Sequence, residues 1–316
     1  MICISLSEEF MRFGQLLKDH DEYSIEIVRK KHLSTLFNPS NINNPALAAN
    51  LKKLFQEMRA DLPFSDDHIA LALPPEWFDL SRNSVDKGLS PENIAKVLDW
   101  NAAKRLGAVA EQKFIQHYPL QSPTNADPEY LSVSYFKDLG KLLQNAAEPA
   151  GFKIQIIDIN LFSAAAALER LEQIGKNKKW GVCLVGEQKH SLIVIDSGEF
   201  RQLIQFEIND LENYSILRSS SADDIGEKIV SEINGIRTFA SDSLSSVDRL
   251  YYYSHNVDSG FFNMLLTYDI ANLKTVNPFK NIKPVNMYAD DGDGIGAMCQ
   301  FIDLLGLMFR EIPEDA

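Results

Sequence analysis

The order of strand-like and helix-like segments is the feature that most constrains how this chain folds. Alternating apolar residues predict three short strands within residues 2–28, and a second group of three strands lies within residues 182–204. Each group is followed by segments in which helical spacing of apolar residues alternates with further strand-like runs. A strand meander followed by helix and strand alternation, occurring twice in one chain, indicates a duplicated α/β fold.

Local signals place the main elements of the first half. Pro45 opens a pattern in which apolar residues share one helical face (Leu47, Leu51, Leu54, Phe55 and Met58). The apolar run 69–73 is stopped by Pro74 and Pro75 and suits a buried strand. A further strand is expected at 130–135, where strand and helix alternation resumes.

Residues 76–125 differ in character and predict a small inserted subdomain. Ser90, Pro91 and Glu92 form a typical helix start, with a cap residue, a first-turn proline and an early acid. Residues 119–128 are rich in turn formers. We therefore expect a first half at 1–75 and 126–175, the insert at 76–125 and a second half at 176–316, with a cleft between the halves. The last helix is expected to carry one regular apolar stripe from Ile295 to Phe309.

Charge and composition limit the partners. The chain has 31 Lys and Arg against 44 Asp and Glu, a net charge of −13, which argues against nucleic-acid binding because that needs a basic face. No run of about 18 apolar residues occurs, so no membrane span is expected. Cys3, Cys183 and Cys299 are far apart and predict buried thiols in a reducing cytoplasm.

No metal site is predicted. The six histidines are scattered without metal-ligand spacing. An acidic stretch at 290–294 lacks the closing Glu of a calcium loop, because the twelfth position is Phe301. This stretch is interpreted as an acidic turn before the last helix.

Several short segments together resemble the actin-like ATPase superfamily, and within it the group of the pilus assembly protein PilM and the division protein FtsA. They are residues 69–74, 89–94, 99–104, 150–165, the Asn277-Pro278-Phe279 stretch and residues 294–308. The resemblance covers most of the chain and implies a duplicated, ribonuclease-H-like fold around a nucleotide cleft.

The nucleotide motifs of that superfamily are degenerate here. The first Asp-x-Gly turn would hold metal and phosphate, but its two key positions are Ser5 and Ser7. The second turn keeps only Gly186, with His190 or Ser191 near the expected threonine, and the adenosine-side glycines are reduced to Gly260. These positions define a degenerate cleft. No cofactor is expected, because Mg²⁺ and ATP would lose the carboxylates that hold the metal.

The resemblance implies a non-catalytic scaffold of a type IV pilus or type II secretion-like machine. It would lie in the cytoplasm at the inner membrane and bind the cytoplasmic tail of an inner-membrane partner near the insert, with self-association through actin-like contacts. The alternative is a diverged ATPase or small-molecule kinase, for which Asp158 and Asp196 are the candidate acids.

Overall fold

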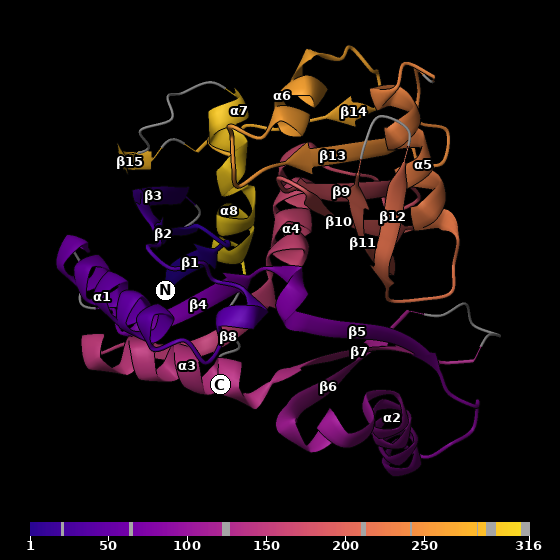
Figure 1. Cartoon of the computed structure of the whole chain (residues 1–316), viewed down its shortest axis with the longest axis horizontal. Coiled ribbons are helices and arrows are strands. Elements are labelled where there is room, and N and C mark those ends of the chain that lie inside the picture. The colour runs from indigo at the N-terminus through magenta and orange to yellow at the C-terminus, as the bar shows by residue number, and fades with distance from the viewer. Residues whose placement is uncertain are drawn as a thin grey trace.

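Two six-stranded sheets and one three-stranded sheet are present in the described part of the chain (Figure 1). The computed structural model describes residues 1–19, 22–62, 66–121, 127–209, 213–240, 242–282, 284–288 and 295–310. In each large sheet, consecutive antiparallel strands continue into two parallel strands. The predicted duplicated α/β fold is therefore confirmed. The acidic stretch 290–294 lies outside the described residues.

The first large sheet has the order β15-β3-β2-β1-β4-β8. Its strands are β1 (Ile2–Leu6), β2 (Phe10–Asp19), β3 (Glu22–His32), β4 (His68–Leu73), β8 (Lys153–Ile159) and β15 (Pro284–Tyr288). The helices α1 (Pro45–Asp61) and α3 (Lys137–Ala147) pack against each other beside it (Figure 1). The Asn44 side chain accepts a hydrogen bond from the Ala46 amide and caps α1, and the five predicted core residues of α1 are all buried.

The second large sheet has the order β12-β11-β10-β9-β13-β14. Its strands are β9 (Lys179–Val185), β10 (Lys189–Asp196), β11 (Glu199–Ile208), β12 (Tyr214–Ser219), β13 (Arg249–Tyr253) and β14 (Leu273–Lys274). Helix α5 (Ile225–Arg237) packs on β10, β11 and β12, and α6 (Gly260–Thr267) follows β13.

The three-stranded sheet has the order β5-β7-β6, from β5 (Phe78–Ser84), β6 (Lys113–Leu120) and β7 (Glu129–Phe136), and carries α2 (Pro91–Leu106). The expectation that the strand at 130–135 belongs to the first half is wrong, because β7 is the central strand of this small sheet. The alternating pattern of β7 is compatible with either sheet. Its pairing with β5, more than forty residues upstream, is a long-range contact that residue periodicity does not predict.

The end of the chain lies against the first half. Strand β15 pairs with β3, and the closing helix α8 (Ile302–Met308) packs on β1, β2 and β4 beside α4 (Asn160–Glu172). Figure 1 shows α4 and α8 side by side between the two large sheets. The single striped helix expected from residue 295 is instead α7 (Ile295–Met298), a short 3-10 turn (Cys299–Phe301) and α8. Every residue of α8 is buried, because it is covered from all sides.

Close contact between α4 and α8 depends on one glycine. A Cβ atom on Gly306 would lie 1.6 Å from the carbonyl oxygen of Ser163. Only a residue without a side chain lets the two backbones approach this closely.

Candidate functional site

A cavity of about 650 Å³ lies between the halves, and we call it the cleft. The turn after β1, the turn after β9, and the segments that follow β4 and β13 all contribute to its lining. Three of the six predicted cleft residues line this cavity, namely Ser7, Gly186 and Ser191. The cleft expected between two halves of an actin-like chain is thus present as a cavity.

The other three predicted residues lie elsewhere. Ser5 is fully buried behind the cleft. His190 is buried, and its ring packs between the rings of Phe206 and Phe261, with centroids 5.1 and 4.9 Å away. Gly260 begins α6 with open space around its Cα and is not part of the cleft wall.

The first hairpin turn is closed by hydrogen bonds between Ser7 and Phe10. The Ser7 amide donates to the Phe10 carbonyl over 2.9 Å, and the Phe10 amide donates to Ser7 Oγ over 3.2 Å. Between them stand Glu8 and Glu9, which both line the cleft. This turn therefore presents carboxylates where a phosphate-binding turn would present free amides.

The second hairpin turn needs its glycine for backbone packing, whether or not a phosphate binds there. A Cβ atom on Gly186 would lie 2.1 Å from the Lys189 carbonyl oxygen, so the tight turn itself excludes a side chain. The Gly186 carbonyl accepts a hydrogen bond from Ser259 Oγ at 3.3 Å. The glycine is accounted for by backbone packing.

A buried polar network lies directly behind the cleft. The Asp303 carboxylate on α8 accepts hydrogen bonds from Ser5 Oγ on β1 at 2.7 Å and from His255 Nε2, after β13, at 2.8 Å. Arg12 Nη2 on β2 donates to Ser5 Oγ at 3.2 Å. Asp303 and Arg12 are both fully buried. One carboxylate on the last helix therefore connects a strand of the first half to a loop of the second.

The electrostatics of this network favour a charged aspartate and a neutral histidine. Burial alone would raise the pKa of Asp303, but the hydrogen bond from His255, the charge of Arg12 and the hydrogen bond from Ser5 hold that pKa below its usual range. Burial, and then the neighbouring Arg12 charge, lower the pKa of His255 to about 4. The buried arginine and aspartate thus balance each other, and the neutral imidazole donates from Nε2.

Glu76 is the most perturbed acid of the cleft. It follows Pro74 and Pro75 at the end of β4, and its side chain is accessible from the cavity. The protein walls around the cavity desolvate this exposed side chain in part, which raises its pKa to about 7, and the charge of Glu8 adds to the effect.

The two acids expected for an enzyme do not reach the cleft. Asp158 ends β8 and binds Arg310 Nη2 and Ser163 Oγ, each at 2.7 Å. Asp196 ends β10, where its carboxylate accepts from Ser197 Oγ at 3.0 Å. Neither residue lines the cleft.

A second cavity of about 360 Å³, which we call the groove, lies between the three-stranded sheet and α4. Its lining is largely aromatic and aliphatic, from Phe78, Phe114, Tyr118, Leu131, Val133, Tyr135, Phe162 and Phe200. Acidic and basic groups stand at Asp158, Glu169 and Arg310, and burial raises the pKa of Glu169. An apolar cavity with a few charged groups is a typical ligand or peptide site.

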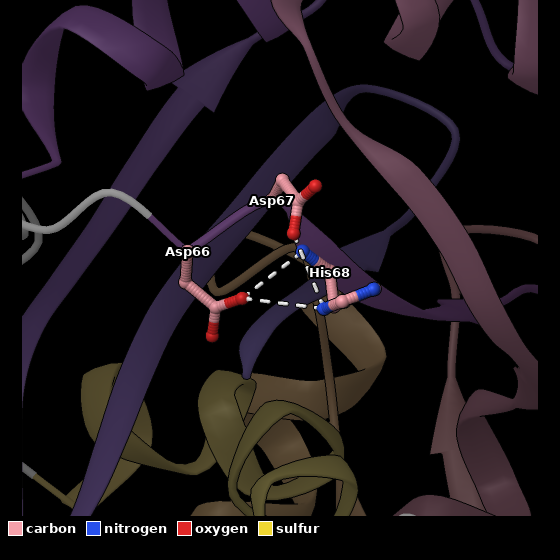
Figure 2. A group of neighbouring side chains, drawn as sticks. All are labelled: Asp66, Asp67 and His68. Carbon is pink, nitrogen blue, oxygen red and sulfur yellow. Dashed lines mark hydrogen bonds and ion pairs between the residues drawn. The ribbon is translucent and has the colours of Figure 1, made fainter.

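One cluster among the described residues has metal-ligand spacing. Asp66, Asp67 and His68 bring one ligand atom each within 4.8 Å of one another. Figure 2 shows these three neighbouring side chains. Both carboxylates already pair with cations, Asp66 with the Met1 ammonium at 2.8 Å and Asp67 with Lys153 at 2.9 Å. These ion pairs stabilise the carboxylates without a metal.

Comparison with known proteins identifies the fold of this chain. No family model matches the chain, and a search of curated proteins finds no match. Among solved structures, a chain of the "PilM-PilN type IV pilus biogenesis complex" superposes with a TM-score of 0.66 at 13% identity, covering 97% of both chains. A Bacteroides thetaiotaomicron protein of actin-like ATPase fold and unknown function gives a TM-score of 0.45 at 16% identity, covering 98% of this chain and 95% of that chain. The cytoplasmic domain of EpsL, an inner-membrane component of the Vibrio cholerae type II secretion system, gives 0.45 at 7% identity, covering 96% of this chain and 94% of that chain.

The chain therefore has the actin-like ATPase fold. More particularly, it has the form of that fold found in the PilM–PilN structure, as the resemblance implied. None of the helices in the described ranges is both long and apolar enough to cross a bilayer.

Residue patterns missed three members of the cleft region, namely Glu76, His255 and Asp303. A signal existed for Asp303, which is the one acid in the apolar run 298–308. Glu76 directly follows a buried strand and two prolines, a position at a sheet edge where ligand-binding residues gather. His255 carried no comparable signal.

Proposed function

We propose that this chain is a peptide-binding scaffold and that the groove is its binding site. The observation that carries the proposal is the exposed aromatic surface of the groove. Phe114 is 47% and Tyr118 48% exposed, beside the half-buried Tyr135. Aromatic side chains left open around a concave apolar cavity are characteristic of protein interaction sites.

The proposed partner is the cytoplasmic tail of an inner-membrane protein in a type IV pilus or type II secretion-like machine. The support is the likeness in fold to a chain from a PilM–PilN complex. On this proposal the chain lies peripherally at the inner membrane, without ATP or Mg²⁺, and self-associates through actin-like contacts.

Titration with overlapping peptides from the cytoplasmic tail of a PilN-like protein of the same organism tests the groove. Ala166→Leu would fill it from α4, and Phe114→Ala would remove an aromatic wall. Each should weaken binding about tenfold or more. Trp100→Ala is the matched control, because Trp100 is 62% exposed on α2 of the same subdomain and does not line the groove. Equal loss in the control, or no peptide binding, would refute the groove as the site.

A diverged enzyme is the second candidate, and Glu76 is the observation that favours it. A carboxyl group with a pKa of about 7 in a cavity is suited to general-base chemistry near neutral pH. Phosphate release from Mg·ATP by the wild type, abolished in Glu76→Gln, would establish this activity. Release that persists in the variant would refute the role.

A further inference from the structure

Acids outnumber bases among the charged residues that line the cleft. Glu8 and Glu9 reach it from the turn after β1, Glu76 from the segment after β4, and Glu187 from the turn after β9. Among the residues that the structure describes, Lys189 is the only lysine or arginine in the lining. The cavity therefore has the wrong charge for a nucleotide and attracts cations.

His255 adds a neutral acceptor to the cavity lining. This side chain is buried, with 7% of its surface exposed, and its Nε2 faces the Asp303 carboxylate at 2.8 Å. A carboxylate only accepts, so Nε2 carries the proton and Nδ1 of the neutral ring is an acceptor. No described residue donates a hydrogen bond to Nδ1, and this atom, unlike the fully buried Nδ1 of His190, is accessible from the cavity. It can therefore accept a hydrogen bond from a ligand in the cleft or from water.

Ser191 is a second buried polar group of the wall. It is 7% exposed, and its Oγ accepts a hydrogen bond from Gln205 Nε2 at 3.3 Å. Together with His255 it places hydrogen-bonding groups between the acids of the two halves. The four carboxylates of the lining only accept hydrogen bonds when ionised, which matches a ligand rich in N–H donors.

The spacing of these acids argues against a single metal ion. Within the described ranges, the one group of ligand atoms close enough to share an ion is Asp66, Asp67 and His68, outside the cleft. A calcium or magnesium ion needs several oxygens converging on one point. Carboxylates spread over a cavity of about 650 Å³ instead suit a ligand whose positive charges are spread as well.

We propose that the cleft binds a linear polyamine, a small flexible molecule with several ammonium groups. Its ammonium groups would pair with Glu9, Glu76 and Glu187, and one would donate to His255 Nδ1. Glu8 is already engaged by the Asn38 amide at 2.8 Å and would act through its charge. This site is separate from the peptide groove and does not depend on it.

Calorimetric titration of the full chain with spermidine at about 150 mM salt tests the proposal, since that salt screens diffuse surface attraction. We expect saturable binding of one ligand with a dissociation constant below about 1 mM. Glu76→Gln and Glu187→Gln should each weaken it about fivefold, and Lys189→Gln should strengthen it about twofold. Glu227→Gln, an exposed acid on α5 that lines neither cavity, should leave it unchanged.

Four results would overturn the proposal. They are no saturable binding, an equal loss in Glu227→Gln, binding that neither cleft variant weakens, and displacement of spermidine by an equal concentration of Mg²⁺. Peptide titration of the same variants separates this proposal from the scaffold, because the cleft substitutions leave the groove intact. Loss of polyamine binding with retained peptide binding is the expected pattern.

Discussion

Asp303 accepts a hydrogen bond from His255 over 2.8 Å, although 48 residues separate them along the chain. The same carboxylate oxygen also accepts from Ser5 at 2.7 Å, so one atom of α8 connects β1 to the loop after β13. The connection is fully buried and lies directly behind the cleft. It fixes how the two halves meet at this point.

Replacing Asp303 by alanine should strongly destabilise the protein. The substitution would leave Ser5 Oγ and His255 Nε2 buried without their acceptor, and it would remove a negative charge that Arg12 stabilises, which together costs about 3–5 kcal/mol of unfolding free energy. Urea denaturation followed by circular dichroism measures this. Asp258→Ala, at an exposed aspartate in the loop after His255, should change stability by less than about 0.5 kcal/mol. A midpoint shift no larger than that of the control would contradict the role of the network.

Replacing Gly306 by alanine should separate α8 from α4. The new Cβ would lie 1.6 Å from Ser163 O, so one helix must move, at a cost of about 3 kcal/mol. Gly260→Ala is the matched control, because nothing lies within 4 Å of a Cβ there, and it should be neutral or slightly stabilising. Thermal unfolding of both variants tests this prediction. Equal melting temperatures for Gly306→Ala and Gly260→Ala would show that α8 and α4 do not approach each other closely at Gly306.

His190 should make the protein sensitive to acid. Burial, and then the charge of Arg237, lower the pKa of His190 to about 4 in the folded state, against 6.5 for a histidine in the unfolded chain. As the pH falls below 6.5 the unfolded chain binds a proton that the folded chain does not, so stability falls until about pH 4. At pH 5 the loss relative to pH 7 is about 2 kcal/mol.

His190→Phe tests that assignment. The ring would remain among Phe206 and Phe261, and the Nδ1 atom, which is buried without a partner among the described residues, would be removed. We expect the variant to lose about 2 kcal/mol less than the wild type between pH 7 and pH 5 in urea denaturation. Identical losses would assign the acid sensitivity to other groups.

Mg·ATP should not bind. Glu8 and Glu9 stand in the first turn, and the amides of Ser7 and Phe10 donate within that turn, so a phosphate would meet negative charge there. Calorimetric titration at near-millimolar Mg·ATP should give no saturable heat. Micromolar binding would remove the case for a non-catalytic scaffold.

Local patterns in the sequence determined much of this fold. The stripe from Leu47 to Met58 and its start at Pro45 predicted α1 closely, and the run 69–73 predicted β4. These succeed because helical and strand periodicity, caps and prolines act within a few residues of one another. The superfamily resemblance likewise depended on the order of such local units.

Only the tertiary structure decided how distant pieces were paired. It placed β7 in the small sheet, Asp303 beside Ser5 and His255, and Gly306 against Ser163. It also made the cleft acidic, because Glu76 and Glu187 are brought together from different halves. Strand partners and buried charges are determined by contacts between residues far apart in the chain. The free energy of these contacts depends on the environment that the fold creates rather than on neighbouring residues in the sequence.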